Sequence, residues 1–259
     1  TLSAKNAAAL DKDLMSIGAF SIDQLMELAG LSVSQAGCLI LSQFSVSILQ
    51  AEADESWSPA DPAITVAMDS SQRDTSGITD TNPRYTIQNR ARTISIKSVS
   101  PLHVYISTQL TLTHPTQRLT TQLKNLSVPF TEDFPKAIKE TDHIIDAIFG
   151  FSFSGEVREP FPAVITALQE THLPVTSVDA PSSWNIEDGP PPSGPGASFM
   201  PGTLVSLTAP KPLVKFFKGR HFVGGRFVSP DIAQKYDLDL PEYEGIDQIV
   251  EVGSSGQKL

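Results

Sequence analysis

The sequence predicts a layered α/β fold in which helices cover a mainly parallel sheet. Short apolar runs alternate with helical periodicity in the second half of the chain, and this alternation is typical of βαβ units. The runs at 143–148 and 174–178 read as buried strands, and residues 162–171 between them form an amphipathic helical pattern. This strand–helix–strand order predicts that the two strands are parallel neighbours in one sheet. At 259 residues the chain is long enough for one large domain with a substantial core.

Two helices are expected at the start of the chain. Ser3 can cap a first helix that runs to about Met15. Ser21 and Gln24 have the spacing of a capping box, and the second helix that they begin carries an apolar stripe. We expect this stripe to pack on a core, because such a pattern is more often structural than part of a cofactor site. Its members are Ile22, Leu25, Met26, Ala29 and Val33.

An atypical segment follows at about 38–113. Serine and threonine become frequent there, and helical or strand periodicity is weak. The apolar runs at 64–68 and 102–106 are candidate strands, although no turn residues frame a regular alternation. A structureless stretch of this length is unusual inside a compact domain.

Regular elements return near residue 114. Leu119, Leu123 and Leu126 indicate a helix, and residues 134–139 indicate a shorter one. Further strands are expected at 204–208 and 222–228. Ser229 and Pro230 then begin a short helix that extends to Tyr236, since proline is well placed at a first helical position.

Composition excludes several classes of protein. The formal net charge of −10 is unfavourable for a nucleic-acid-binding surface. The single cysteine, Cys38, cannot form an internal disulfide, and no histidine nearby in sequence marks it as a nucleophile. No apolar run approaches the roughly 20 residues that span a bilayer. The first residues lack the pattern of a secretory signal peptide. The five histidines have no metal-ligand spacing.

Two aspartates are the strongest candidates for a site. Asp146 and Asp179 each follow a predicted strand, and each is followed by a turn. Ligands of open parallel sheets bind beyond the carboxyl ends of the strands, so both carboxylates should face one crevice. There they can bind a cation, a ribose hydroxyl or a proton. Arg158 and Lys211 are candidate phosphate contacts near the same strand ends, although a solvated surface charge is the commoner role of such residues.

A glycine-bracketed loop follows Asp146. Glycines allow a backbone to approach a ligand closely, and loop amides can face an anion. The alternative is an ordinary strand-to-helix connection whose phenylalanines belong to the core. The chain contains neither a dinucleotide GxGxxG fingerprint nor a Walker loop, which disfavours a dehydrogenase that uses intact NAD. The loop residues are Gly150, Phe151, Ser152, Phe153, Ser154, Gly155 and Glu156.

Four motifs occur in a characteristic order. They are DAIFGFSFSGEVREPF at 146–161, SVDAPSSW at 177–184, GTLVSLTAPKP at 202–212 and HFVGGRFV at 221–228. Together with the helical segment SIDQLMELAGLSVSQA and the closing PEYEGIDQIVEV, they resemble the NAD(P)H-hydrate epimerases of the YjeF N-terminal family, especially the fungal ones. The resemblance covers about residues 3–36 and 114–252.

The resemblance implies a Rossmann-like three-layer α/β/α domain over residues 1–252, with 253–259 as a tail. It implies an isomerase that interconverts the R and S epimers of hydrated NADH and NADPH in nicotinamide cofactor repair. Such enzymes are usually homodimers, are functionally linked to a dehydratase that acts on one epimer, and are cytoplasmic, with the mitochondrion as a second location. No nucleic-acid or membrane partner is expected.

The same resemblance assigns roles to the site residues. Asp146 and Ser182 are expected to ligate a potassium ion. The loop at 150–156 is expected to wrap the substrate. Asp179 is expected to contact the damaged nicotinamide ring and to act as the catalytic acid/base, which suits a carboxylate because epimerisation requires proton movement.

One family motif is missing from the sequence. Members carry a GPGNNGGDG-type loop after the second helix, which supplies phosphate-binding amides and a potassium-ligating asparagine, and the segment at 38–113 has no such loop. Three explanations are open: a translated intron or frame shift, a degenerate relative that retains the fold as a binding or interaction protein, and an unrecognised equivalent loop. The first predicts a disordered or poorly packed segment, and the second predicts order without cofactor chemistry.

Overall fold

The main sheet of the computed structural model has nine strands among the residues that the structure describes, which are 1–41, 47–50, 64–68, 85–89, 92–96, 104–106, 114–131, 133–141 and 143–253. Their order across the sheet is β11-β10-β9-β8-β7-β2-β1-β5-β6. The bounds are Ser47–Gln50 (β1), Ile64–Met68 (β2), Val104–Ile106 (β5), Phe130–Thr131 (β6), His143–Asp146 (β7), Val175–Val178 (β8), Thr203–Leu207 (β9), Arg220–Gly224 (β10) and Val250–Val252 (β11). Tyr85–Asn89 (β3) and Arg92–Ile96 (β4) form a separate antiparallel pair.

The sheet is mixed and mostly parallel, which confirms the predicted fold class. β7, β8, β9 and β10 are parallel neighbours, as are β1, β5 and β6. β2 lies between these two groups and is antiparallel to both β7 and β1. β11 pairs antiparallel with β10 at one edge. The predicted βαβ unit is present as β7, helix α5 (Phe161–Glu170) and β8.

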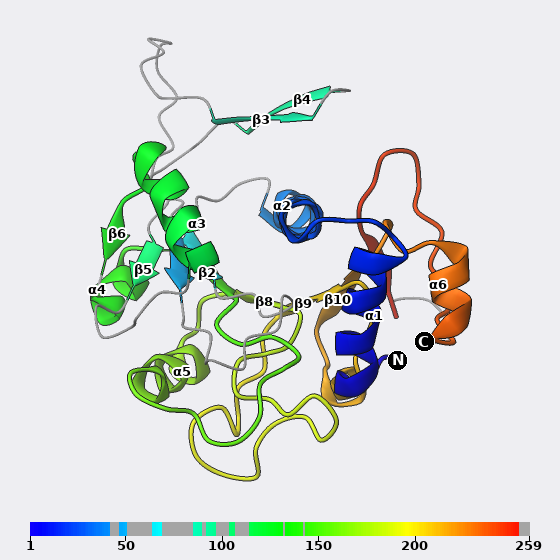
Figure 1. Ribbon diagram of the computed structural model, residues 1–259. Coiled ribbons are helices and arrows are strands. Elements are labelled where there is room, and N and C mark those ends of the chain that lie inside the picture. The colour runs from blue at the N-terminus through cyan, green and yellow to red at the C-terminus, as the bar shows by residue number, and fades with distance from the viewer. Residues whose placement is uncertain are drawn as a thin grey trace.

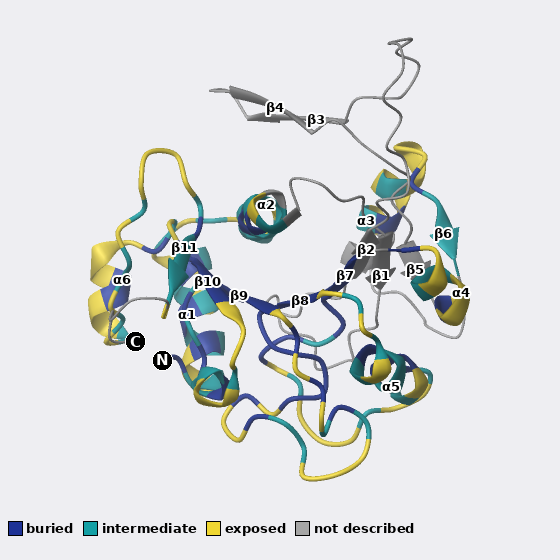
Figure 2. Ribbon diagram, turned by 180° about the vertical axis from the view of Figure 1, so that it is seen from behind, coloured by how far each residue is buried: buried dark blue, intermediate teal, exposed yellow. Residues whose placement is uncertain are grey.

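Helices lie on both faces of the sheet (Figure 1). α2 (Ile22–Leu41) covers one face, where Ala36 packs with Val205 and Phe222. α1 (Ala4–Ser16) and α5 cover the other face, where Leu204 packs with α1. Consecutive strand residues point to opposite faces, so β9 contributes to both layers of the core. Figure 2 shows the buried strands β7 to β10 between these helices.

The remaining helices lie along the rest of the chain. α3 (His114–Asn125) lies on the α2 side of the sheet in Figure 1, and α4 (Phe134–Lys139) precedes β7. A 3₁₀ helix, η1 (Pro212–Phe216), follows β9, and α6 (Pro230–Lys235) follows β10. The predicted helices at 134–139 and from residue 230 are therefore confirmed. Ser229 caps α6 by accepting a hydrogen bond from the Ile232 amide.

Local capping explains where the first two helices begin. The Ser3 hydroxyl accepts a hydrogen bond from the Asn6 amide at 3.3 Å, as predicted. Ser21 and Gln24 form a reciprocal capping box, with bonds of 2.8 and 3.2 Å. Leu10 is fully buried in α1 and contributes about 1.5–3 kcal/mol through burial.

Two sequence predictions need correction or restriction. The strand expected at 222–228 is displaced: β10 spans Arg220–Gly224, because Gly224 and Gly225 lead into a turn closed by the Val228 amide and the Gly225 carbonyl. Within the segment at 38–113, the candidate strands correspond to β2 and β5. Most of that segment lies outside the described residues, and so does the prediction of its disorder.

Candidate active site

The ends of three parallel strands bring the candidate residues together. β7 ends at Asp146, Asp179 directly follows β8, and Thr208 directly follows β9. Asp146 is in register with Ser177, which lies two residues before Asp179. Both predicted carboxylates therefore lie at the carboxyl edge of the sheet, where open α/β folds bind ligands.

Asp146 is a fully buried carboxylate surrounded by hydroxyl and amide donors. Its Oδ2 accepts hydrogen bonds from the Ser177 hydroxyl at 2.8 Å and the Ser182 amide at 2.9 Å. Its Oδ1 accepts a hydrogen bond of 2.5 Å from the Ser182 hydroxyl. Burial raises the pKa of Asp146, and these hydrogen bonds oppose the rise only in part. Among the described residues, no basic side chain forms an ion pair with it.

Asp179 has a different partner, which is the ammonium group of Lys211. Nζ of Lys211 donates to Asp179 Oδ1 and, at 2.6 Å, to the Leu207 carbonyl. The side chains of Lys211 and Asp179 are only 3% and 2% exposed. The interpretation of Lys211 as a solvated surface charge is therefore wrong. Lys211 lies four residues beyond β9, and its side chain reaches back to Asp179 at the end of the neighbouring strand, β8.

Three residues at this edge have left-handed backbone conformations. φ is 67° at Asp179, 76° at Ser183 and 65° at Thr208. Non-glycine residues rarely adopt such angles, and a β-branched threonine does so least readily. Strain of this kind costs about 1–3 kcal/mol per residue and is concentrated at functional sites. One of these three strained residues is the candidate carboxylate Asp179 itself.

The loop at 150–156 contacts Asp179, and the residue before the loop contacts Ser182. The Phe151 amide donates to Asp179 Oδ2 at 3.0 Å, and the preceding Phe149 amide donates to the Ser182 hydroxyl at 3.3 Å. Phe151 is buried in the core, as the alternative interpretation of the loop predicted. Ser152, Ser154, Gly155 and Glu156 are exposed. The loop thus combines one anchored aromatic residue with a solvent-facing segment.

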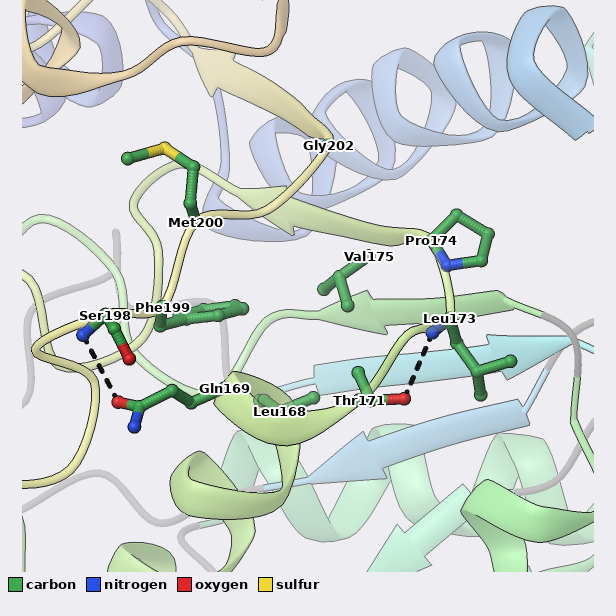
Figure 3. A pocket seen from close by; sticks show the side chains of 10 residues that line it. All are labelled: Leu168, Gln169, Thr171, Leu173, Pro174, Val175, Ser198, Phe199, Met200 and Gly202. Carbon is green, nitrogen blue, oxygen red and sulfur yellow. Dashed lines mark hydrogen bonds between the residues drawn. The ribbon is translucent and has the colours of Figure 1, made fainter.

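One cavity among the described residues lies at the opposite end of the strands (Figure 3). It has a volume of about 230 Å³ and lies against the first residue of β8. None of its lining residues can titrate, so it offers no acid/base chemistry. We therefore place the candidate site at the carboxyl edge. The lining residues are Leu168, Gln169, Thr171, Leu173, Pro174, Val175, Ser198, Phe199, Met200 and Gly202.

Two histidines are buried in the sheet, and one of them, His221, lies within electrostatic range of Lys211. His143 Nε2 lies 3.0 Å from Thr176 Oγ1, and His221 Nε2 lies 2.8 Å from Ser206 Oγ. Burial lowers the pKa of each histidine to about 4. In the part of the chain that the structure describes, no cluster of three or more His, Cys, Asp or Glu residues could hold a metal, and no helix is long and apolar enough to cross a membrane.

Comparison with known proteins identifies the family. Residues 88–213 match the family described as YjeF-related protein N-terminus. The NAD(P)H-hydrate epimerase of Phaeosphaeria nodorum is 55% identical over 259 residues, which cover 100% of this chain and 97% of that protein. The chain belongs to the NAD(P)H-hydrate epimerase family. The epimerase of Schizosaccharomyces pombe is 40% identical, over 97% of this chain and 95% of that protein.

A solved structure agrees with this membership of the epimerase family. The crystal structure of yeast ynu0 superposes with a TM-score of 0.73 at 28% sequence identity. The alignment covers 97% of this chain and 99% of that one.

Proposed function

We propose that this chain is an isomerase that interconverts the R and S epimers of hydrated NADH and NADPH. The names of the curated relatives support the reaction, since they are NAD(P)H-hydrate epimerases that match nearly all of the chain. The observation that carries the proposal is the buried carboxylate of Asp179, held at a strand end beside an exposed glycine-bracketed loop.

Asp179 is suited to proton transfer. Inversion at the hydrated carbon breaks its carbon–oxygen bond and re-forms it from the other face of the ring. One proton is delivered to the departing hydroxyl group, and one is removed from the returning water. Oδ2 of Asp179 accepts one hydrogen bond, from Phe151, and a carboxylate oxygen can accept more than one. We propose that this oxygen exchanges protons with the substrate.

Access to Asp179 requires movement of the loop at 150–156. Asp179 is only 2% exposed, and the Phe151 amide contacts its Oδ2. Loops that cover a reacting centre and open for substrate are common in enzymes. We propose that the exposed part of the loop wraps the substrate once Phe151 shifts, and that Glu156 and the flanking glycines belong to this segment.

The other carboxylate, Asp146, is the candidate site for a potassium ion. Asp146 Oδ1 and the Ser182 hydroxyl oxygen are hydrogen-bonded to each other at 2.5 Å. Both are oxygen atoms of the kind that hard cations prefer as ligands. A buried carboxylate without a basic partner also leaves a countercharge to be supplied. We propose that Asp146 and Ser182 hold potassium, which would supply that charge and fix the turn after β7.

The assembly and location are further parts of the proposal, and they rest on the resemblance. We propose a homodimer that is cytoplasmic, with the mitochondrion as a second location, and that works with a dehydratase specific for one epimer. Light scattering coupled to size-exclusion chromatography measures the oligomeric state, and a monomeric mass would contradict the dimer.

The reaction is tested with purified chain and hydrated NADPH enriched in one epimer. In potassium buffer, we expect the two epimers to equilibrate faster than they do spontaneously. Chromatographic separation of the epimers measures the rate. Asp179→Ala should lower kcat by about 10²–10⁴-fold, the usual contribution of general acid/base catalysis. Asp188→Ala, which removes an exposed aspartate, is the matched control. An inactive wild-type chain would refute the proposed function, and an active Asp179→Ala variant would refute the role of Asp179.

A further inference from the structure

Lys211 is a buried charged residue to which the proposed reaction gives no role. Its ammonium group contacts three separate segments of the site. It donates to Asp179 Oδ1 after β8 and to the Leu207 carbonyl at the end of β9, and it lies 5.9 Å from the ring centre of Phe151. These contacts place Lys211 at the junction of both strand ends and the loop.

Burying this lysine is unfavourable for the fold alone. Lysine is among the residues least often fully buried, because its ammonium group loses its hydration. Replacing both members of a buried ion pair by well-packed apolar side chains is often neutral or stabilising, so such a pair is weak evidence of a purely stabilising role. The chain nevertheless holds Lys211 firmly between Pro210 and Pro212, and the Leu2 amide donates to the Pro210 carbonyl at 2.8 Å. A costly group held this precisely indicates a functional role.

The two oxygens of Asp179 are not equivalent. Oδ1 accepts hydrogen bonds from Lys211 and, at 3.3 Å, from the Leu207 amide. Among the described residues, Oδ2 accepts a hydrogen bond only from the Phe151 amide, on the loop that must move for substrate to enter. Lys211 therefore fixes the carboxylate by one oxygen and leaves the other toward the loop.

We propose that Lys211 is a positioning residue for Asp179, holding Oδ1 so that Oδ2 faces the hydrated nicotinamide ring. This inference rests on the proposed function. Lys211 acts through the orientation of the carboxylate, so its loss should impair turnover more than substrate binding. A partner that only stabilised the fold would change the fraction of folded protein and leave kcat per folded molecule unchanged.

The first test is Lys211→Met, which keeps the length of the side chain and removes the charge. We expect kcat to fall about 10–100-fold, by analogy with groups that orient metal ligands in enzymes, with KM for hydrated NADPH changing much less. Circular dichroism and thermal unfolding establish that the measured sample is folded. Lys215→Met is the matched control, because Lys215 is exposed on η1 and contacts the ring of Phe216.

The second test is chemical rescue of Lys211→Ala, with potassium held at a constant saturating concentration. Added methylammonium should restore kcat saturably, because it is small enough to enter the cavity left by the substitution and can donate to Asp179. Tetramethylammonium cannot donate a hydrogen bond and should not restore it. If Lys211→Ala does not fold, Lys211→Gln takes its place, because glutamine retains N–H donors without the charge. The kcat of Lys211→Gln should also be lower than that of the wild type.

The outcomes separate the two proposals. An inactive wild-type chain refutes the proposed function and this inference together. An active wild-type chain with folded Lys211 variants of unchanged kcat refutes only the positioning role. A folded Lys211→Ala variant with low kcat that methylammonium does not rescue also refutes it. A selective fall in kcat with rescue by methylammonium supports it.

Discussion

The substitution Asp146→Asn tests how the protein holds its buried carboxylate. Burial raises the pKa of Asp146 above its ordinary value of 3.8. The folded state therefore binds this proton more tightly than the unfolded state does. The stability that Asp146 contributes is complete below pH 3.8 and is lost as the pH rises through the folded-state pKa. An asparagine at this position does not titrate and should not show this loss.

The geometry limits the other effects of the substitution. An amide oxygen in the place of Oδ2 can accept the hydrogen bonds from Ser177 and from the Ser182 amide. An amide nitrogen in the place of Oδ1 can donate to the Ser182 hydroxyl, which then loses its own acceptor, but it cannot accept the 3.5 Å hydrogen bond from the Ile148 amide. We expect a cost of about 1–2 kcal/mol from these lost hydrogen bonds. Against it, the wild type loses about 1.4 kcal/mol for each pH unit between the unfolded-state and folded-state pKa.

The assay is urea unfolding of both proteins, followed by tryptophan fluorescence, from about pH 4 to about pH 8. The free energy of unfolding of Asp146→Asn minus that of the wild type should rise with pH and then become constant. Trp184 is buried, so its emission should report the loss of the core. A difference that stays flat, or that falls as the pH rises, would refute the reasoning that burial dominates at Asp146.

Potassium should act in the opposite direction to burial, because a cation favours the ionised carboxylate. At a potassium concentration of about 100 times Kd, the wild type should gain about 2.7 kcal/mol at neutral pH. Asp146→Asn should gain much less, and sodium at equal ionic strength is the control. Equal effects of potassium on both proteins would contradict the proposed site.

Two further predictions concern the core around the site. His143→Gln should reduce the loss of stability in acid. Burial lowers the pKa of His143 from 6.5 to about 4. The neutral histidine therefore contributes about 3 kcal/mol to stability above pH 6.5, and this contribution is lost as the pH falls toward 4. Urea unfolding at several pH values measures this, and an unchanged pH dependence would contradict it. Gly196→Ala places a Cβ against the Ser183 hydroxyl at a φ of 89°. Gly194 has a similar φ of 83°, but a Cβ there would meet no atom within 4 Å. Gly196→Ala should therefore lower the free energy of unfolding by about 1–3 kcal/mol more than Gly194→Ala does. Equal thermal destabilisation of the two variants would show that strain, and not the contact with Ser183, decides the cost.

The sequence predicted the features that depend on nearby residues. In the cap of α1, and in the capping box of Ser21 and Gln24, the bonded residues are three positions apart in the sequence. Such a short spacing can be recognised from the sequence alone. The rule that parallel strands end at one edge also predicted that Asp146 and Asp179 lie at the same edge of the sheet.

Pairings across the sheet were beyond such reasoning. Asp179 and Lys211 are 32 positions apart, and only the register of β8 with β9 brings them together. The flanking prolines of Lys211 were the one available signal, since they fix the backbone on both sides of a lysine. The antiparallel direction of β2 was equally unpredictable, because its apolar run at 64–68 identifies a strand but not its partners.

The hydrogen bond from the Leu2 amide to the Pro210 carbonyl has a practical consequence for handling this protein. Leu2 is 1% exposed and packs in the same core as Ala209 and Leu213, on either side of Lys211. Residues ahead of α1 therefore support the candidate site structurally. A proteolytic cut or an insertion between Leu2 and α1 would disturb that support, so preparations for kinetics should keep this short segment intact.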